Sequence, residues 1–101
     1  MEKTFVYVVT IIIEISGGIF GEKLIGVTSS SIAAFKLLEE FDHMKFYREN
    51  LIEDTDVTEG NHLKEIGTED DSAYFSETIY IHGEEDTSGT IIKNIYQREL
   101  A

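Results

Sequence analysis

The sequence predicts an α+β fold of the order β-β-α-(acidic loop)-β-β, with one amphipathic helix packed on one face of a mostly antiparallel sheet. Three observations predict it: a β-branched apolar run near the N-terminus, one stretch with helical spacing of apolar residues, and two alternating segments in the C-terminal third. The 101 residues suffice for one core but not for two, so we expect residues 1–101 to form a single domain.

The first two strands are expected to pair as a hairpin. Thr4–Ile15 is an apolar, β-branched run without clean alternation, which is typical of a central strand that is covered on both faces. Ser16-Gly17-Gly18 signals the turn, Gly21-Glu22 ends the loop, and Lys23–Thr28 is the second strand. Gly26 within that strand indicates a bulge or the close approach of another segment.

The pattern after the hairpin predicts one helix from Ile32 to Arg48. The serines at 29–31 supply hydroxyls where a helix N-cap needs them. The apolar residues that recur at three-four spacing are Ala34, Leu37, Leu38, Phe41, Met44 and Leu51. We expect the helix to pack on the sheet through Leu38 and Phe41.

Beyond the helix, residues 50–72 lose all periodicity and gain acids and glycines. We expect a long acidic loop with one short element around His62–Ile66, and a loop of this length is usually functional or disordered. Tyr74–His82 and Thr90–Leu100 alternate as strands do, and Gly83–Gly89 joins them as a hairpin loop.

Two features of composition indicate a cytoplasmic protein with no membrane segment. The chain has no cysteine, which excludes disulfides and thiolate chemistry and fits a reducing compartment. Phe5–Ile15 is the one apolar run, but it is shorter than the ~20 residues of a membrane span, and Glu14 interrupts it.

The negative charge is concentrated in the middle of the chain. The formal net charge is −12, and the stretch from Glu39 to Asp86 alone carries 16 acids against three bases, a net charge of −13. The remaining residues carry a net charge of +1. Such a field repels nucleic acid and anionic membranes and attracts basic surfaces.

Motifs for catalysis, cofactors and metals are weak or incomplete. Ser16–Lys23 has the glycines of a phosphate loop, but Glu22 separates Gly21 from the lysine and a strand follows where a helix is needed. Asp54–Glu65 places oxygens at several EF-hand positions, but its glycine falls one residue late and no helix pair is evident. We therefore predict no enzyme, no cofactor and no metal site.

The three histidines and the paired acids also lack the context that chemistry requires. His43, His62 and His82 lie in different predicted elements and have no ligand-spaced neighbour. Neighbouring acids on loops, such as Glu69-Asp70-Asp71, give no sign of the pocket that would shift one carboxyl pKa for acid–base catalysis.

Two hypotheses of function remain, and both are binding functions. In the first, loop carboxylates imitate nucleic-acid phosphates and occupy a basic groove on a protein that handles nucleic acid. In the second, the charge serves solubility, and the protein is an interaction module or a homodimer that binds through sheet edges or apolar patches. The predicted partner-binding acids of the first hypothesis are Glu53, Asp54, Asp56, Glu69, Asp70, Asp71, Glu84, Glu85 and Asp86.

The chain as a whole resembles the small acidic proteins of phages and mobile elements in low-GC Gram-positive bacteria. The features that carry the resemblance are the opening FVYVVTIII, the segment EKLIGVTSS leading into IAAFKLLEEF, the hairpin sequence EEDTSG and the small size. This group includes anti-CRISPR inhibitors of type II CRISPR effector nucleases. The resemblance implies a partner with a basic channel for guide RNA or target DNA, in a host cytoplasm, and no direct binding of nucleic acid by this chain.

Overall fold

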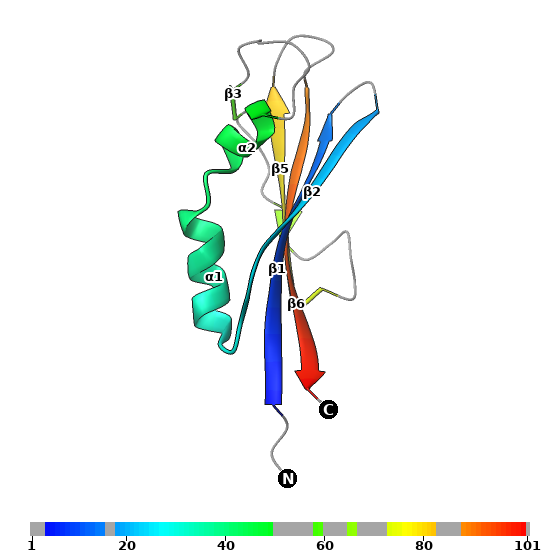
Figure 1. Cartoon of the computed structure of the whole chain (residues 1–101). Helices are drawn as coiled ribbons and strands as arrows, with labels where there is room; N and C mark the ends of the chain where they lie inside the picture. The colour runs from blue at the N-terminus through cyan, green and yellow to red at the C-terminus, as the bar shows by residue number, and fades with distance from the viewer. Residues whose placement is uncertain are drawn as a thin grey trace.

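The computed structural model describes residues 4–15, 18–49, 58–59, 65–66, 73–82 and 88–100, which form an antiparallel sheet with two short helices on one face (Figure 1). The predicted α+β class is therefore confirmed. The elements are β1 (Thr4–Ile15), β2 (Ile19–Thr28), α1 (Ser31–Glu40), α2 (His43–Glu49), β3 (Thr58–Glu59), β4 (Glu65–Ile66), β5 (Phe75–His82) and β6 (Gly89–Leu100).

The strand order is β2-β1-β6-β5-β3, and β4 also pairs with β5. The first and last long strands are therefore neighbours, in a register that runs from Thr4 opposite Leu100 to Ile15 opposite Gly89. The molecule is elongated, with extents of 54 × 22 × 22 Å, and the strands run along its long axis (Figure 1).

The predicted central position of the first strand is confirmed, because β1 lies between β2 and β6. Its odd-numbered residues face the helices, and Val9, Ile11 and Ile13 there are fully buried. On the opposite face only the middle of the strand is buried, since Thr10 is 8% exposed whereas Glu14 is exposed. The expectation that both faces are covered therefore holds for mid-strand alone.

The predicted hairpin of the first two strands is confirmed, but its second strand is longer than predicted. β2 begins at Ile19, so residues 19–22, which were expected to end the loop, are paired strand. The turn before it contains Gly18, whose φ of 92° lies in the region that favours glycine.

Both roles predicted for Gly26 are found in β2. The register with β1 shifts between Val9 and Thr10, whose partners are Gly26 and Leu24, which marks a bulge. A Cβ on Gly26 would lie 3.0 Å from Leu37 Cδ1 of α1, so the missing side chain allows the helix to approach the strand closely.

The single predicted helix Ile32–Arg48 is wrong, because the chain forms two helices with a break at Phe41-Asp42. Ser30 caps α1 as expected, and its hydroxyl accepts a hydrogen bond from the Ala33 amide at 3.2 Å. At the break, Asp42 Oδ1 accepts a hydrogen bond from the Lys45 amide at 2.9 Å. Asp42 thus starts α2 as a second N-cap, the position that aspartate favours over a helix interior.

The core lies between the helices and the helix-facing side of the sheet. Its buried residues are Val9, Ile11, Ile13, Ile15, Ala34, Leu38, Tyr47, Ile79, Ile81, Ile91 and Ile95. The predicted contact of Leu38 is confirmed, whereas Phe41 is only half-buried and packs against the edge of this cluster.

The last two predicted strands are confirmed as β5 and β6, which pair antiparallel. β6 begins at Gly89, so this glycine belongs to the strand and not to the predicted loop. The predicted acidic loop at 50–72 lies outside the described residues, apart from β3 and β4. None of the helices in the described ranges is long and apolar enough to cross a membrane.

Candidate functional site

All nine predicted partner-binding acids lie outside the described residues. They are Glu53, Asp54 and Asp56 in residues 50–57, Glu69, Asp70 and Asp71 in residues 67–72, and Glu84, Glu85 and Asp86 in residues 83–87. His62 and most of the weak calcium-loop pattern at Asp54–Glu65 also lie there.

The described residues that flank two of these segments meet at one end of the sheet. His82, before residues 83–87, pairs with Thr58, which follows residues 50–57. Gly89, just after residues 83–87, pairs with Ile81 on one side and Ile15 on the other. We call this the Gly89 end; it is the upper end in Figure 1.

Helix α2 reaches the same end through its buried Tyr47. A Cβ built on Gly89 would lie 2.7 Å from the Tyr47 hydroxyl and 3.0 Å from Ile15 Cα, and it would collide with the Glu14 carbonyl oxygen. Burial raises the pKa of the Tyr47 hydroxyl above its ordinary value of 10.0. The Gly89 end is therefore a tightly packed junction of three strands and one helix.

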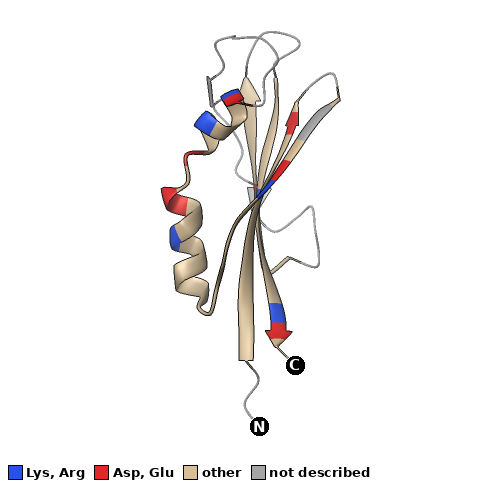
Figure 2. Ribbon diagram, in the orientation of Figure 1, with Lys and Arg blue, Asp and Glu red and all other residues tan. Residues whose placement is uncertain are grey.

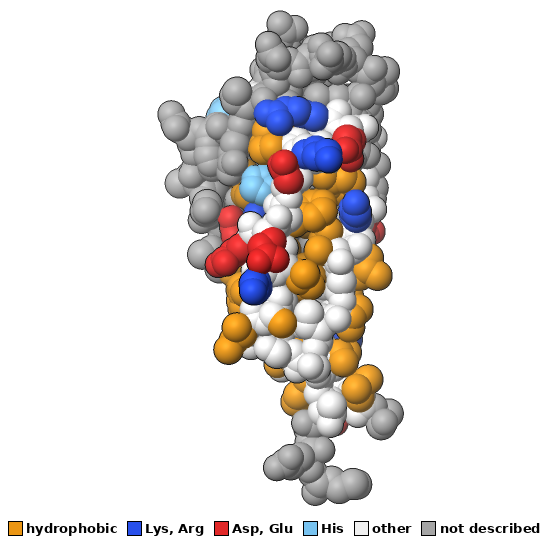
Figure 3. Space-filling view, turned by 60° about the vertical axis from the view of Figure 1, so that its left-hand side comes forward, with side chains coloured by type: hydrophobic (Ala, Val, Ile, Leu, Met, Phe, Trp, Pro, Cys, Tyr) orange, Lys and Arg blue, Asp and Glu red, His pale blue; other side chains and the backbone are white. Residues whose placement is uncertain are grey.

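The described part of the chain does not form a surface of one sign. It carries ten acids against six bases, a net charge of −4, so the remaining residues carry −8 of the total of −12. Basic and acidic side chains are interspersed along the helices and strands (Figures 2 and 3). One pair on α1, Lys36 and Glu40, is 3.9 Å apart and well exposed, so it contributes little to stability.

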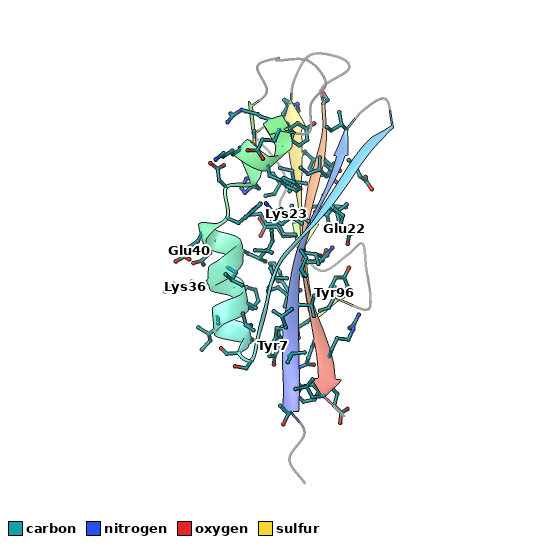
Figure 4. All side chains as sticks on the ribbon, viewed as in Figure 1. Tyr7, Glu22, Lys23, Lys36, Glu40 and Tyr96 are labelled. Atoms are coloured by element: carbon teal, nitrogen blue, oxygen red, sulfur yellow. The ribbon has the colours of Figure 1, made fainter. Side chains whose placement is uncertain are left out.

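A cation–aromatic cluster joins the edge strand to the helix break. The Lys23 ammonium lies 5.5 Å from the ring centres of both Phe41 and Phe46, and the two rings meet edge to face at 5.8 Å. Lys23 points from β2 toward the helices, whereas Glu22 points to the other side of the sheet (Figure 4). A cavity of about 250 Å³ lies here, lined also by Asp42, Lys45 and Glu49.

A structural role is enough to explain the contacts of this cluster. Its lysine already stands over both rings, an arrangement that contributes about 0.5–1 kcal/mol at exposed sites. Asp42 already caps α2 through its carboxylate. The cluster therefore fixes the joint between the helices on the edge of the sheet.

A second, larger hollow of about 450 Å³ lies between α1 and β5. It is lined by Phe35, Leu38, Glu39, Phe75, Glu77 and Lys93. Lys93 is only 8% exposed and stands directly opposite Glu77 in the β5–β6 register. The hollow thus combines aromatic walls with both signs of charge.

The sheet face opposite the helices contains a buried polar row. Thr10, Asn94 and Ser76 stand opposite one another across β1, β6 and β5, and each is at most 8% exposed. Among the described residues, Thr10 Oγ1 and Asn94 Oδ1 find no hydrogen-bond partner. Buried oxygens without a partner cost stability, so the described contacts of this row add no strength to the sheet.

The acidic and histidine side chains of the described ranges do not gather into a metal centre. These ranges contain no group of three His, Asp or Glu side chains that could hold a metal ion. The two described histidines belong to different elements, His43 to the start of α2 and His82 to the end of β5.

Comparisons with known protein families, with curated proteins and with solved structures give no match.

Neither the hollow at Lys23 nor the hollow between α1 and β5 was predicted from the sequence. The hollow at Lys23 depends on the helix break, for which the preference of Asp42 for N-cap positions was the available signal. The hollow at α1 and β5 depends on how far the helix extends across the sheet, which no local pattern encodes.

Proposed function

We propose that this protein is an inhibitor of the anti-CRISPR type, which binds a basic nucleic-acid-handling surface of a bacterial nuclease through its acidic segments. The partner class is a type II CRISPR effector nuclease in the cytoplasm of a bacterial host. In this proposal residues 50–72 form the long acidic loop, and the chain acts by occupation of a groove and not by catalysis.

The observation that carries the proposal is the convergence at the Gly89 end. Residues 50–57 and 83–87 together contain six acids and no lysine or arginine. The described residues next to them pair at this end, where Thr58 lies opposite His82 and Gly89 lies opposite Ile81. Chain connectivity therefore tethers six like charges to one end of an elongated molecule.

The physics of the proposed contact is that of phosphate recognition with the roles exchanged. A groove lined by lysine and arginine attracts nucleic-acid phosphates, and a set of carboxylates at one end of a narrow protein competes for the same cations. Binding should release counterions, so the affinity should depend steeply on salt. Glu69, Asp70 and Asp71 follow Ile66, which pairs with Glu77 away from the Gly89 end, and we include them as a second group of contact acids.

The test is a binding and cleavage assay with a purified type II effector nuclease, with and without guide RNA. We expect the affinity to fall by roughly a thousandfold or more between about 50 and 200 mM salt, as for six or more phosphate-like contacts. We also expect target DNA or guide RNA to compete with the inhibitor. Simultaneous binding of nucleic acid and inhibitor, or an affinity that is indifferent to salt, would contradict phosphate mimicry.

A different observation favours the second candidate function, an interaction module or homodimer. The described large hydrophobic side chains that are exposed include Val27, Ile32, Tyr74 and Leu100, at 48–81% exposure. All four lie toward the opposite end of the sheet, where Thr4 pairs with Leu100 and Tyr7 contacts both Thr28 and the Tyr74 ring. We call this the Leu100 end.

Sedimentation velocity separates the two candidates. A concentration-dependent dimer that Leu100→Ser and Ile32→Ser both dissociate would favour the interaction module, because these changes remove exposed apolar surface only. A monomer at all concentrations would favour the inhibitor.

A further inference from the structure

Described residues of α1, β5 and β6 line the hollow between α1 and β5, and none of them is one of the nine predicted partner-binding acids. It exists because α1 lies toward one side of the sheet. Leu37 of α1 approaches Gly26 of β2, so the helix is drawn toward the edge formed by β2. Phe35 and Glu39, one helical turn apart on α1, line the hollow together with residues of β5 and β6.

The walls of the hollow are apolar and aromatic. The Phe35 and Phe75 rings meet edge to face, with centres 4.8 Å apart and planes at 71°. Leu38 adds a nearly buried aliphatic surface. At about 450 Å³ the hollow has the size of a binding pocket for one side chain or small molecule.

The described side chains that line the hollow carry two carboxylates and one ammonium, an excess of one carboxylate. Lys93 and Glu77 stand opposite each other across β6 and β5, so the buried ammonium has a cross-strand counter-charge. Glu39 is exposed, and within the described residues it forms no ion pair. A ligand that enters therefore meets aromatic surfaces beside a carboxylate whose charge is not matched.

This combination fits a cation on an apolar stem. Arginine satisfies it best, because its planar guanidinium stacks on aromatic rings and pairs with carboxylates through two hydrogen bonds at once. We propose that the hollow between α1 and β5 binds an arginine side chain that a protein partner presents. This proposal uses none of the acids of the proposed function, and the two stand or fall independently.

The test uses blocked amino acids, whose side chain supplies the only charge. We expect N-acetyl-L-argininamide to cause saturable shifts of the Phe35, Leu38 and Phe75 amide resonances in ¹H–¹⁵N NMR spectra, with an affinity in the millimolar range. N-acetyl-L-norleucinamide has an apolar stem without the cation, and N-acetyl-L-glutamic acid amide carries an anion. Both should bind at least about tenfold more weakly, since they lack the guanidinium contacts with ring and carboxylate.

Two matched variants locate the site. Glu39→Gln should weaken binding of the arginine probe by about threefold to fivefold, as the loss of one exposed ion pair does. Glu40→Gln is the control, because Glu40 is an exposed neighbour that pairs with Lys36 and is not among the residues that line the hollow. Unchanged spectra of both variants without the probe verify that the fold is intact.

Three results would overturn the proposal. Equal binding of the norleucine probe would make the hollow a plain apolar groove, and preference for the glutamate probe would make it an anion site at Lys93. Shifts that do not saturate, or that Glu39→Gln and Glu40→Gln reduce alike, would show general attraction to an acidic protein.

Binding of the arginine probe by a chain that fails to bind any effector nuclease would leave this inference standing and the proposed function refuted.

Discussion

The two ends of the elongated sheet differ in packing and in the side chains around them. At the Gly89 end, β1, β5 and β6 come together under Tyr47, and Ile13, Ile79 and Ile91 are at most 1% exposed. At the Leu100 end, β1 and β6 run beyond the last paired residues of β2 and β5, and Leu100 is 53% exposed. The better packed end is therefore the one where the described neighbours of residues 50–57 and 83–87 lie.

This difference has a physical reason. Like charges that are gathered at one end repel each other and oppose folding, whereas burial of several isoleucines contributes roughly 1.5–3 kcal/mol for each side chain. A tightly packed junction at the Gly89 end can offset that repulsion.

The largest expected effect is at the Gly89 end. Gly89→Ala should destabilise the protein by about 3 kcal/mol, because the added methyl would collide with the backbone at Glu14 and Ile15, which cannot move aside independently. Gly26→Ala is the matched strand control and should cost about 1 kcal/mol, since only the end of the Leu37 side chain must shift. Urea unfolding measures both, and equal costs would contradict the tight junction.

A smaller loss is expected midway between the ends, where Phe41 joins α1 to α2. Phe41→Ala should cost about 2 kcal/mol, less than the 3–5 kcal/mol of a fully buried phenylalanine, because the ring is half-buried. It should also remove one ring beneath the Lys23 ammonium. A cost below about 0.5 kcal/mol in urea unfolding would show that the joint is not packed.

The Tyr47 hydroxyl should contribute a pH-dependent part of the stability at the Gly89 end. Its pKa is raised in the folded state, so the folded protein holds this proton where the unfolded chain releases it. The contribution is complete below the ordinary tyrosine pKa of 10.0 and is lost as the pH rises above that value.

Tyr47→Phe tests this sign directly. We expect a cost of about 1 kcal/mol at neutral pH and a flatter decline of stability above pH 10.0 than in the unmodified protein. The measurement is urea unfolding across the alkaline range. Parallel curves for the two proteins would contradict the burial of this hydroxyl.

The smallest effect is expected at the Leu100 end. Ile32→Ser should change the free energy of unfolding by no more than about 0.5 kcal/mol, because the side chain is 81% exposed. It should also leave nuclease binding unchanged if the Gly89 end makes the contact. A large loss of stability in thermal unfolding would mean that Ile32 is covered in solution.

Local patterns predicted the elements of the fold but not all of their limits. The β-branched run from Thr4 to Ile15 defined β1 to the residue, because no breaker lies inside it. The helix break was missed because Phe41 and Met44 continue the apolar spacing across Asp42, so periodicity outweighed the weaker capping signal. The pairing of β1 with β6 joins residues far apart in the sequence, and local spacing carries no information about it.

The candidate sites divide in the same way. The acid clusters could be named from the sequence, because the position of each charged residue is read directly from it. Their role in partner binding remains a prediction. The arginine hollow could not be predicted, since it depends on the lateral position of α1 over the sheet and on the β5–β6 register that places Glu77 beside Lys93.

We propose that the acids of residues 83–87, which the chain tethers to the Gly89 end, make the partner contact. The most direct test is the affinity for the effector nuclease after Glu84, Glu85 and Asp86 are all replaced by lysine. The control replaces Glu22, Glu40 and Glu99, which are exposed on β2, α1 and β6, and changes the net charge by the same amount. We expect the first variant to lose binding while its unfolding curve is unchanged, and the control to keep most of its affinity, because local repulsion in a groove outweighs total charge. Equal losses in both variants, or full binding by the first, would contradict the claim.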